Sequence, residues 1–430
     1  MRFLLALIGF NFIILIHELG HFVAARLSGI KVLELSLFIG PKIFGFRRGE
    51  TEYSLRLIPV LAYVKLEGED EVSDSDRSYS KKPLPARMAT IAAGPFMSIF
   101  IGVLFLAINY SIIGYDTTRL SKVYEGSPAY VAGLRDGDRI VKYDGKRVYQ
   151  PLDVGMFLYE SKGKTVELEF QRDKQNLKTI FTPEIIPANR YILGFEGKEY
   201  YGKGSNVVKT VFKDSPADKG GILPGDEIIK LNDEVVTTKQ QIVKYVNINK
   251  DRPMKVTVLR NGETVELSNI VPVPDKNPEQ YDAGIAFTTE KGNAFSVIGN
   301  AFVNTYSITR IGFYSIIWLI KGEVPFSQMM GPIGAVSAIN TVVQQSPTAL
   351  MVFLDLLRIC VLISIGLGVT NLLPIPPADG SKLILLIVEG IRGKPIPFEK
   401  EAFIMMIGFF LMLLLFVVTA YNDILRVFTG

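Results

Sequence analysis

The fold and the chemistry of this chain both follow from the stretch Ile13-Ile14-Leu15-Ile16-His17-Glu18-Leu19-Gly20-His21-Phe22. It is an HExxH motif inside an apolar run, and it holds both of the 2 histidines of the 430-residue chain. Residues four apart lie on one face of an α-helix, so His17 and His21 can bind one Zn²⁺ together. Glu18 is then placed to take a proton from a water bound to that ion.

The alternative to a metal site is a pair of core histidines that bind nothing. The motif, however, lies in a helix that is apolar on all sides, from residue 3 to residue 25. Ionisable side chains are costly at membrane depth and are functional there by default. The surroundings of His17 and His21 therefore favour the metal site.

The composition indicates membrane spans joined to water-exposed modules. Hydrophobic residues make up 48% of the chain and charged residues 21%, and the mean hydropathy is +0.26. A length of 430 residues fits two or three domains. The net charge of +4 has no concentrated basic patch, so we expect no nucleic-acid partner. With 1 cysteine, Cys360, the chain forms no intramolecular disulfide.

Apolar runs long enough to cross a membrane cover residues 3–25, 88–110, 348–373 and 403–420. The loop between the first two is rich in Lys and Arg, which predicts that it is cytoplasmic and that the chain after residue 110 lies outside. Residues 51–57 of this loop partly alternate as a strand does. The loop is either a hairpin that dips toward the metal site or a plain cytoplasmic connection.

The polar region from 117 to 285 contains an internal repeat. Gly126-Ser127-Pro128-Ala129 recurs 88 residues later as Asp214-Ser215-Pro216-Ala217, and Gly137-Asp138 recurs at the same offset as Gly225-Asp226. A constant offset of this length indicates a duplicated domain. The pattern resembles the PDZ domain, twice, and a PDZ groove binds an extended peptide as an added strand. The alternative is a duplicated β domain without a ligand.

Residues 293–321 form an amphipathic pattern. It predicts one or two helices on the outer membrane surface, within 290–345. A packed soluble helix is the alternative.

A third metal ligand must come from a carboxylate or from Cys360. Asp379 is the best candidate, because it follows three prolines that break the apolar segment after the third span. Irregular backbone at membrane depth is tolerated only inside protein or along a cavity, and an unpaired carboxylate there is costly. Zinc on His17, His21 and Asp379 leaves one position for water. Asn371 is a candidate for stabilising the oxyanion or holding the substrate backbone, and the alternative role for Asp379 is a helix N-cap.

Several motifs resemble, in order along the chain, the bacterial site-2 protease family, specifically its intramembrane zinc metalloproteases with two PDZ domains. They are His17-Glu18-Leu19-Gly20-His21, Ala93-Gly94-Pro95, the tandem repeat, Gly331-Pro332-Ile333-Gly334 and Asn371-Leu372-Leu373-Pro374-Ile375-Pro376 with Asp379-Gly380.

The resemblance implies zinc on His17, His21 and Asp379, with Glu18 as the base. It also implies that Tyr63-Val64-Lys65 ends a membrane-dipping β loop that clamps substrate as a strand. The implied substrates are single-span membrane proteins, such as anti-sigma factors already cut by another protease, or remnant signal peptides. The chain departs from the family pattern at Leu61-Ala62, Ser98 and Ser381.

We therefore expect a polytopic α-helical membrane protein with about four transmembrane helices, a membrane-dipping β hairpin and two inserted PDZ-like α+β domains. The expected parts are an N-terminal membrane half with its β loop, two PDZ-like domains, surface helices and a C-terminal membrane half: residues 1–114 (loop 31–87), 117–200, 201–285, 290–345 and 346–430.

The expected function is an intramembrane zinc endopeptidase of the bacterial inner membrane, with the PDZ domains on the periplasmic side. A catalytically silent scaffold that binds peptides through its PDZ pair is one alternative. A membrane-anchored metalloprotease with its zinc outside the bilayer is the other.

Overall fold

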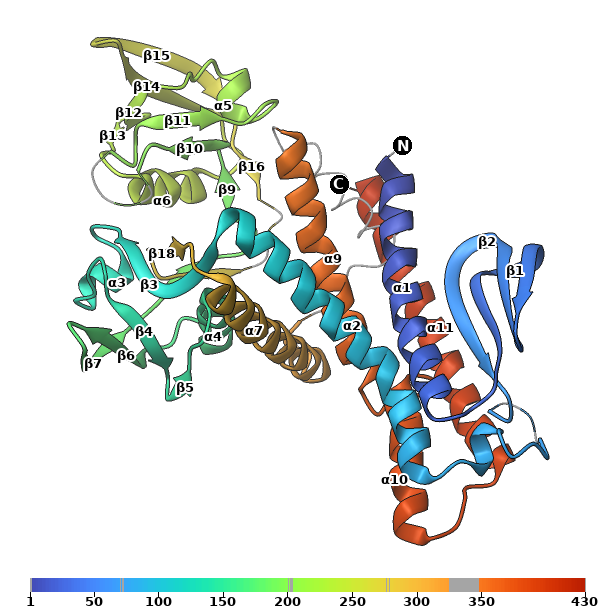
Figure 1. Cartoon of the computed structure of the whole chain (residues 1–430). Helices are drawn as coiled ribbons and strands as arrows, with labels where there is room; N and C mark the ends of the chain where they lie inside the picture. Colours follow the sequence, from blue (N-terminus) through green and yellow to red (C-terminus); the bar gives the residue numbers. More distant parts are fainter. Residues whose placement is uncertain are drawn as a thin grey trace. The chain divides into compact units, whose positions relative to one another are not determined.

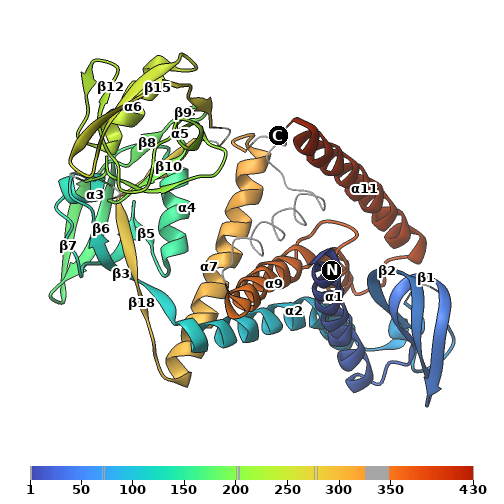
Figure 2. The ribbon, with the colours of Figure 1, turned by 90° about the horizontal axis from the view of Figure 1, so that it is seen from above.

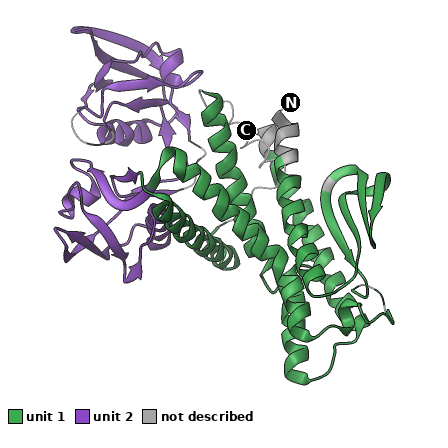
Figure 3. Cartoon of the chain, viewed as in Figure 1, with its two compact units in different colours: residues 1–115, 291–430 green, residues 116–290 purple. Residues whose placement is uncertain are grey.

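The computed structural model describes residues 2–69, 71, 73–199, 201, 204–275, 277, 279–324 and 348–429. The chain divides into two compact units, one of residues 1–115 with 291–430 and one of residues 116–290 (Figure 3). The motif Gly331-Pro332-Ile333-Gly334 and the predicted surface region beyond residue 324 lie outside the described residues.

The first unit is built mainly from long apolar helices (Figure 1). Their bounds are α1 (Arg2–Leu27), α2 (Leu84–Ile113), α7 (Ala294–Ile320), α9 (Ala349–Asn371), α10 (Asp379–Arg392) and α11 (Phe398–Thr429), with a short 3-10 turn, η1 (Tyr79–Lys81). Within the described residues, four helices are long and apolar enough to cross a membrane, over Gly9–Leu27, Leu84–Ile113, Ala349–Asn371 and Phe398–Leu425. They match the four apolar runs of the sequence and support a helical membrane protein.

The HExxH helix α1 is the most buried of the four candidate spans. Of its apolar window, 44% is buried within the chain, against 11% for α11, so α11 is the helix with most surface left for lipid. At the contact of α1 with α2, a Cβ atom on Gly20 would lie 2.4 Å from the carbonyl oxygen of Ala93. The two backbones approach this closely because Gly20 has no side chain. Figures 1 and 2 both show α1, α2 and α9 side by side.

The apolar segment after α9 is broken as the prolines predict. α9 ends at Asn371, the chain is irregular over residues 372–378, and α10 resumes at Asp379. The chain turns back tightly, since a Cβ on Gly380 would lie 2.3 Å from the carbonyl oxygen of Leu372. This turn sets the place of the first residue of α10.

The loop between α1 and α2 forms a hairpin of β1 (Val32–Arg48) and β2 (Thr51–Leu66), paired antiparallel. The prediction of a hairpin is confirmed. Leu35 pairs with both Tyr53 and Val64, so β2 bends round and its last part, residues 62–66, forms an edge beside the first part of β1. Several large apolar side chains of the hairpin are exposed: Ile43, Phe44, Phe46, Leu57, Ile58 and Leu61.

The amphipathic pattern near residue 300 forms one helix, α7. Val297, Ala301 and Thr305, four residues apart, are buried, while Phe295 and Phe302 are exposed. The buried side packs in a core with residues of α2 and α9. The helix is confirmed, and its place on a membrane surface stays a prediction.

The second unit contains the duplicated pattern. Its first repeat consists of β3 (Tyr115–Val123), α3 (Pro128–Val131), β4 (Arg139–Tyr143), β5 (Lys146–Arg147), α4 (Pro151–Ser161), β6 (Val166–Arg172), β7 (Gln175–Phe181) and β8 (Glu184–Ile186). The second repeat consists of β9 (Tyr191–Ile192), β10 (Phe195–Gly197), β11 (Val208–Val211), α5 (Pro216–Lys219), β12 (Glu227–Leu231), β13 (Glu234–Val235), α6 (Lys239–Asn249), β14 (Met254–Arg260), β15 (Glu263–Ile270) and β16 (Val273–Pro274). Two strands, β17 (Gln280–Asp282) and β18 (Ile285–Glu290), follow it.

The duplication extends to buried side chains. The Arg172 guanidinium donates to both oxygens of Asp138, at 2.8 and 2.7 Å, and Arg260 donates to both oxygens of Asp226, at 2.7 and 2.7 Å. Both aspartates are 1% exposed. The same ion pair at the same place in each repeat shows that the two share one fold.

Strand pairing interleaves the two repeats along the chain. β18 pairs beside β3 in the sheet of the first repeat, although it follows the whole second repeat. Leu193, which precedes residue 201, lies in the core of the second repeat. The expected division into 117–200 and 201–285 is consecutive, whereas these pairings insert the second repeat between β8 and β17. The pairing of β17 with β8 returns the chain to the first repeat, whereas β16 pairs with β9 inside the second repeat.

Candidate metal centre

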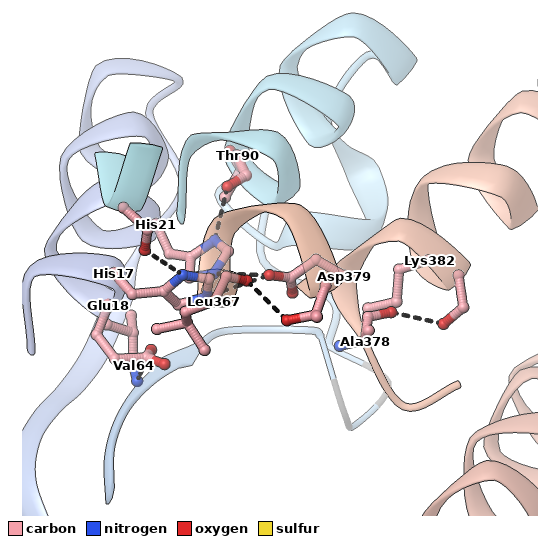
Figure 4. Close-up of polar contacts among 12 residues, drawn as sticks. His17, Glu18, His21, Val64, Thr90, Leu367, Ala378, Asp379 and Lys382 are labelled. Carbon is pink, nitrogen blue, oxygen red and sulfur yellow. Dashed lines mark hydrogen bonds and ion pairs between the residues drawn. The ribbon is translucent and has the colours of Figure 1, made fainter. Parts of the chain in front are cut away.

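The three ligand atoms predicted from the sequence converge on one point (Figure 4). Nε2 of His17 lies 3.2 Å from Nε2 of His21. Oδ2 of Asp379 lies 3.2 Å from Nε2 of His17 and 3.4 Å from Nε2 of His21. His17 and His21 come from successive turns of α1, while Asp379 is the first residue of α10.

These spacings fit a tetrahedral zinc site. With zinc–ligand bonds of about 2.0 to 2.1 Å, two ligands of a tetrahedron are about 3.3 Å apart. The three observed separations, 3.2, 3.2 and 3.4 Å, all lie close to that value. Oδ2 of Asp379 is moreover buried and accepts no hydrogen bond. A carboxylate oxygen in this state fits a cation, and two imidazoles with one carboxylate are a typical donor set of catalytic zinc.

Both imidazoles are oriented by α2. Nδ1 of His21 lies 2.9 Å from the carbonyl oxygen of Thr90, and Nδ1 of His17 lies 3.0 Å from Oγ of Ser98. A carbonyl oxygen only accepts, so Nδ1 of His21 carries the proton and its Nε2 is free for a metal. The contact of His17 with Ser98 allows the same tautomer. Although Ser98 departs from the family pattern, its hydroxyl is a hydrogen-bond partner for His17.

Gly94 makes room for the second ligand. A Cβ at this position would lie 2.2 Å from Nε2 of His21 and 2.5 Å from its Cε1. No side chain fits there, so α2 passes the imidazole with bare backbone. The small-residue motif of the second span therefore serves the site directly.

Glu18 is held at the site by the hairpin. The backbone N–H of Val64 donates to Oε2 of Glu18 over 3.0 Å. Val64 lies in the edge part of β2, so this contact brings the edge of the hairpin to the carboxylate next to His17. Figure 4 shows Glu18, Val64 and the two histidines together.

Asp379 is not an N-cap. Ala378 occupies that position, without a side-chain capping bond, and Asp379 is the first residue inside α10. Its carboxylate instead faces the two imidazoles. The structure thus favours the ligand reading over the capping alternative.

The remaining predicted site residues lie in several places. Asn371 is the last residue of α9. Tyr63 lies beside Val64 in the edge part of β2, with the guanidinium of Arg56 5.5 Å from its ring centre. Lys65 pairs with Glu71 over 2.9 Å. Of the three hairpin residues, Val64 is the one whose backbone N–H donates to Glu18. A role in substrate binding stays a prediction for Asn371, Tyr63, Val64 and Lys65.

The sequence analysis named Gly94 and Ser98 only within the family pattern, did not name Thr90, and missed that all three residues of α2 act on the ligands. Thr90, Gly94 and Ser98 are four residues apart, and the structure places all three against the two histidines. This spacing puts them on one face of α2. A stripe of small and polar residues in an otherwise apolar span was the signal that could have identified them.

Comparison with known proteins assigns the chain to a family. The family model described as Peptidase family M50 matches residues 5–415. The chain is 28% identical to the regulator of sigma-W protease RasP of Bacillus subtilis, over 97% of each chain. It is also 28% identical to the zinc metalloprotease RasP of Oceanobacillus iheyensis, again over 97% of each. Among solved structures, the PDZ domain of HtrA3 bound to a phage-derived ligand aligns with 22% of this chain and 90% of its own, at 20% identity and a TM-score of 0.16.

Proposed function

Because the chain belongs to peptidase family M50, the site-2 protease family, and is a zinc metalloprotease, we propose that it cleaves peptide bonds inside the membrane, in transmembrane segments of single-span proteins. The observation that carries this proposal is the triangle of His17, His21 and Asp379 on helices with the length and composition of membrane spans or directly attached to one. A metalloprotease with its zinc outside the bilayer would not need two of its ligands on α1, a candidate membrane span.

His17, His21 and Asp379 hold the zinc in this proposal. The ion would supply Lewis acidity, which lowers the pKa of a bound water toward neutral pH. Glu18 would take the proton of that water through the carboxylate oxygen that Val64 does not contact. The hydrogen bond from the Val64 N–H holds one carboxylate oxygen of Glu18 and so fixes the orientation of the carboxylate.

The edge of the hairpin is the proposed binding site for substrate. Residues 62–66 pair on one side with β1 and end beside Glu18, so an extended substrate strand added there would bring a peptide bond to the base. Tyr63, Val64 and Lys65 form this edge, and Asn371, at the end of α9, is proposed to hold the substrate backbone. A transmembrane helix must unwind before it can add as a strand.

The two repeats are proposed to act as PDZ domains that bind a peptide or exclude bulky substrates. A cavity of about 410 Å³ is lined by residues 191–196 and the α6 residues Ile242 and Val246, together with residues 184–187 and the β17 residues Gln280 and Asp282. A cavity bordered by a strand and a helix suits an extended peptide. We propose that both repeats lie outside the cytoplasm, with the hairpin loop inside, and that pre-cut anti-sigma factors or remnant signal peptides are the substrates.

The Glu18→Gln variant tests the proposed function. It should abolish cleavage of a membrane-anchored reporter, because an amide cannot accept the proton, while membrane insertion and zinc content stay unchanged. Purified Glu18→Gln should retain one zinc, and His21→Ala should lose it. Unchanged cleavage by Glu18→Gln would refute the enzymatic assignment of Glu18. A wild-type chain that holds peptides but cleaves none would support the scaffold instead.

A further inference from the structure

Helix α10 brings the third ligand to the centre, yet it is short and joined by an irregular segment. It has 14 residues, and Asp379 is its first. Metal ligands must lie within about 0.2 Å of their place, so α10 must be held firmly against the other two ligands. Leu386, near the middle of α10, packs in an apolar core. Such packing stabilises the helix against its neighbours but does not fix its orientation, because the hydrophobic effect is non-directional. Polar contacts of α10 supply the direction.

The first of these contacts joins α10 to the hairpin. Lys382 lies three residues after Asp379, on the same side of α10. Its Nζ donates to Oε1 of Glu69 over 2.7 Å, with the two side chains only 25% and 15% exposed. Glu69 lies in the turn after β2, which ends at Leu66 and in which Val64 donates to Glu18. This ion pair therefore links the helix of the ligand to the strand that holds the base.

The second contact joins α10 to α2. Both terminal nitrogens of the Arg87 guanidinium donate to the two carboxylate oxygens of Glu389, Nη1 to Oε2 over 3.1 Å. The side chains are 12% and 16% exposed. Arg87 lies one helical turn before Thr90, whose carbonyl orients His21. A bidentate pair fixes direction as well as distance, so α10 is also held to the turn that orients the second ligand.

We propose that Lys382 and Glu69 are positioning residues, which hold α10 at the place where Asp379 completes the zinc site. The Arg87–Glu389 pair holds the far end of the helix to α2. Three segments that contact the α1 residues of the centre, α2, the end of β2 and α10, are thus joined by ion pairs less exposed than ordinary surface pairs and less screened by salt. This inference rests on the proposed zinc site and extends it to residues that touch neither metal nor substrate.

A charge swap tests the inference in the full-length protein, purified in detergent. Lys382→Glu and Glu69→Lys each place like charges together and should weaken zinc retention against a chelator about tenfold, as loss of an outer-shell partner does. The double variant Lys382→Glu with Glu69→Lys restores an attractive pair and should recover most of the lost affinity. Lys382→Met removes the charge without repulsion, so it remains informative if a reversal prevents folding.

The matched control is the exposed pair of Arg77 and Glu50, whose two hydrogen bonds are both 2.7 Å long. Reversing both charges there should leave zinc retention unchanged. Thermal melting of the zinc-free protein measures stability separately, so a merely destabilised variant is recognised.

Two outcomes would overturn the inference. One is zinc retention in Lys382→Met and in both reversals that equals the control. The other is a double reversal that recovers no affinity, because an attractive pair at this place would then not position α10. Losses that multiply, to about 100-fold in the double variant, would mean that the two residues act independently. Neither outcome touches the proposed function, which fails instead if wild-type protein retains no zinc or if Glu18→Gln still cleaves.

Discussion

Substitution of Gly94 by alanine tests the geometry of the centre with one added methyl group. Gly94 lies inside α2, where alanine is the better helix former by about 1 kcal/mol. The change should therefore leave the span intact. It should act on the site alone, because the new Cβ points at the imidazole of His21.

The size of the effect follows from the distances. The Cβ would lie 2.2 Å from Nε2 of His21, whereas ordinary contacts begin near 3.4 Å. The imidazole would have to move by about 1 Å, several times the tolerance of about 0.2 Å for a zinc ligand. Moving also stretches the 2.9 Å contact of Nδ1 with the Thr90 carbonyl. We expect zinc affinity to fall by about 100-fold, the upper end of what a disturbed outer shell costs, and cleavage to be lost with it.

Chelator competition on purified protein measures this directly. The control is Gly366→Ala, the same substitution in the apolar helix α9, where a Cβ would meet nothing within 4 Å. Gly366→Ala should retain zinc and activity. If Gly94→Ala binds zinc as tightly as Gly366→Ala, then His21 does not occupy the position described, and the three-ligand arrangement is wrong.

Two further predictions concern the partner of the first ligand and the buried acid of the second repeat. Ser98→Ala removes the hydroxyl 3.0 Å from Nδ1 of His17 and should weaken zinc binding about tenfold in the same competition. Ser98→Thr keeps a hydroxyl and should keep the affinity. If Ser98→Ala binds zinc as tightly as the wild-type protein, the hydroxyl has no role. Burial alone would raise the pKa of Asp226, but the hydrogen bonds of Arg260 hold that pKa below its usual range. The ion pair therefore stabilises the second repeat above pH about 4 and is lost as the pH falls through the lowered pKa. Asp226→Asn should cost about 2 kcal/mol at neutral pH and flatten the acid dependence, measured by hydrogen exchange of β12 and β14 in the full chain; an unchanged acid profile would contradict this.

Local features of this chain could be read from the sequence because they depend on residues close together. The histidines share a helix face at a spacing of four, whatever packs around them. Apolar runs of span length form helices, since backbone polar groups have no other partner in a membrane. The duplication was visible as a constant offset. The equivalent ion pairs of Asp138 with Arg172 and of Asp226 with Arg260 confirm it at the level of side chains.

Asp379 is an intermediate case. The scarcity of histidines and the broken apolar segment pointed to it, together with the family resemblance. The sequence could not exclude that it caps α10. Its distances of 3.2 and 3.4 Å from the two imidazoles favour the ligand role. These distances depend on how α10 packs against α1, so the local sequence could not predict them.

The sequence by itself determined the chemistry available here: two imidazoles and a neighbouring carboxylate on one apolar helix, a distant acid and a duplicated module. Only the tertiary structure decided how these parts meet. It brought Thr90 and Ser98 to the histidines, Val64 to Glu18, Lys382 to Glu69 across 313 residues, and β18 back to β3. The physical reason is that such contacts depend on how whole helices and strands pack against one another. No single stretch of sequence determines that packing.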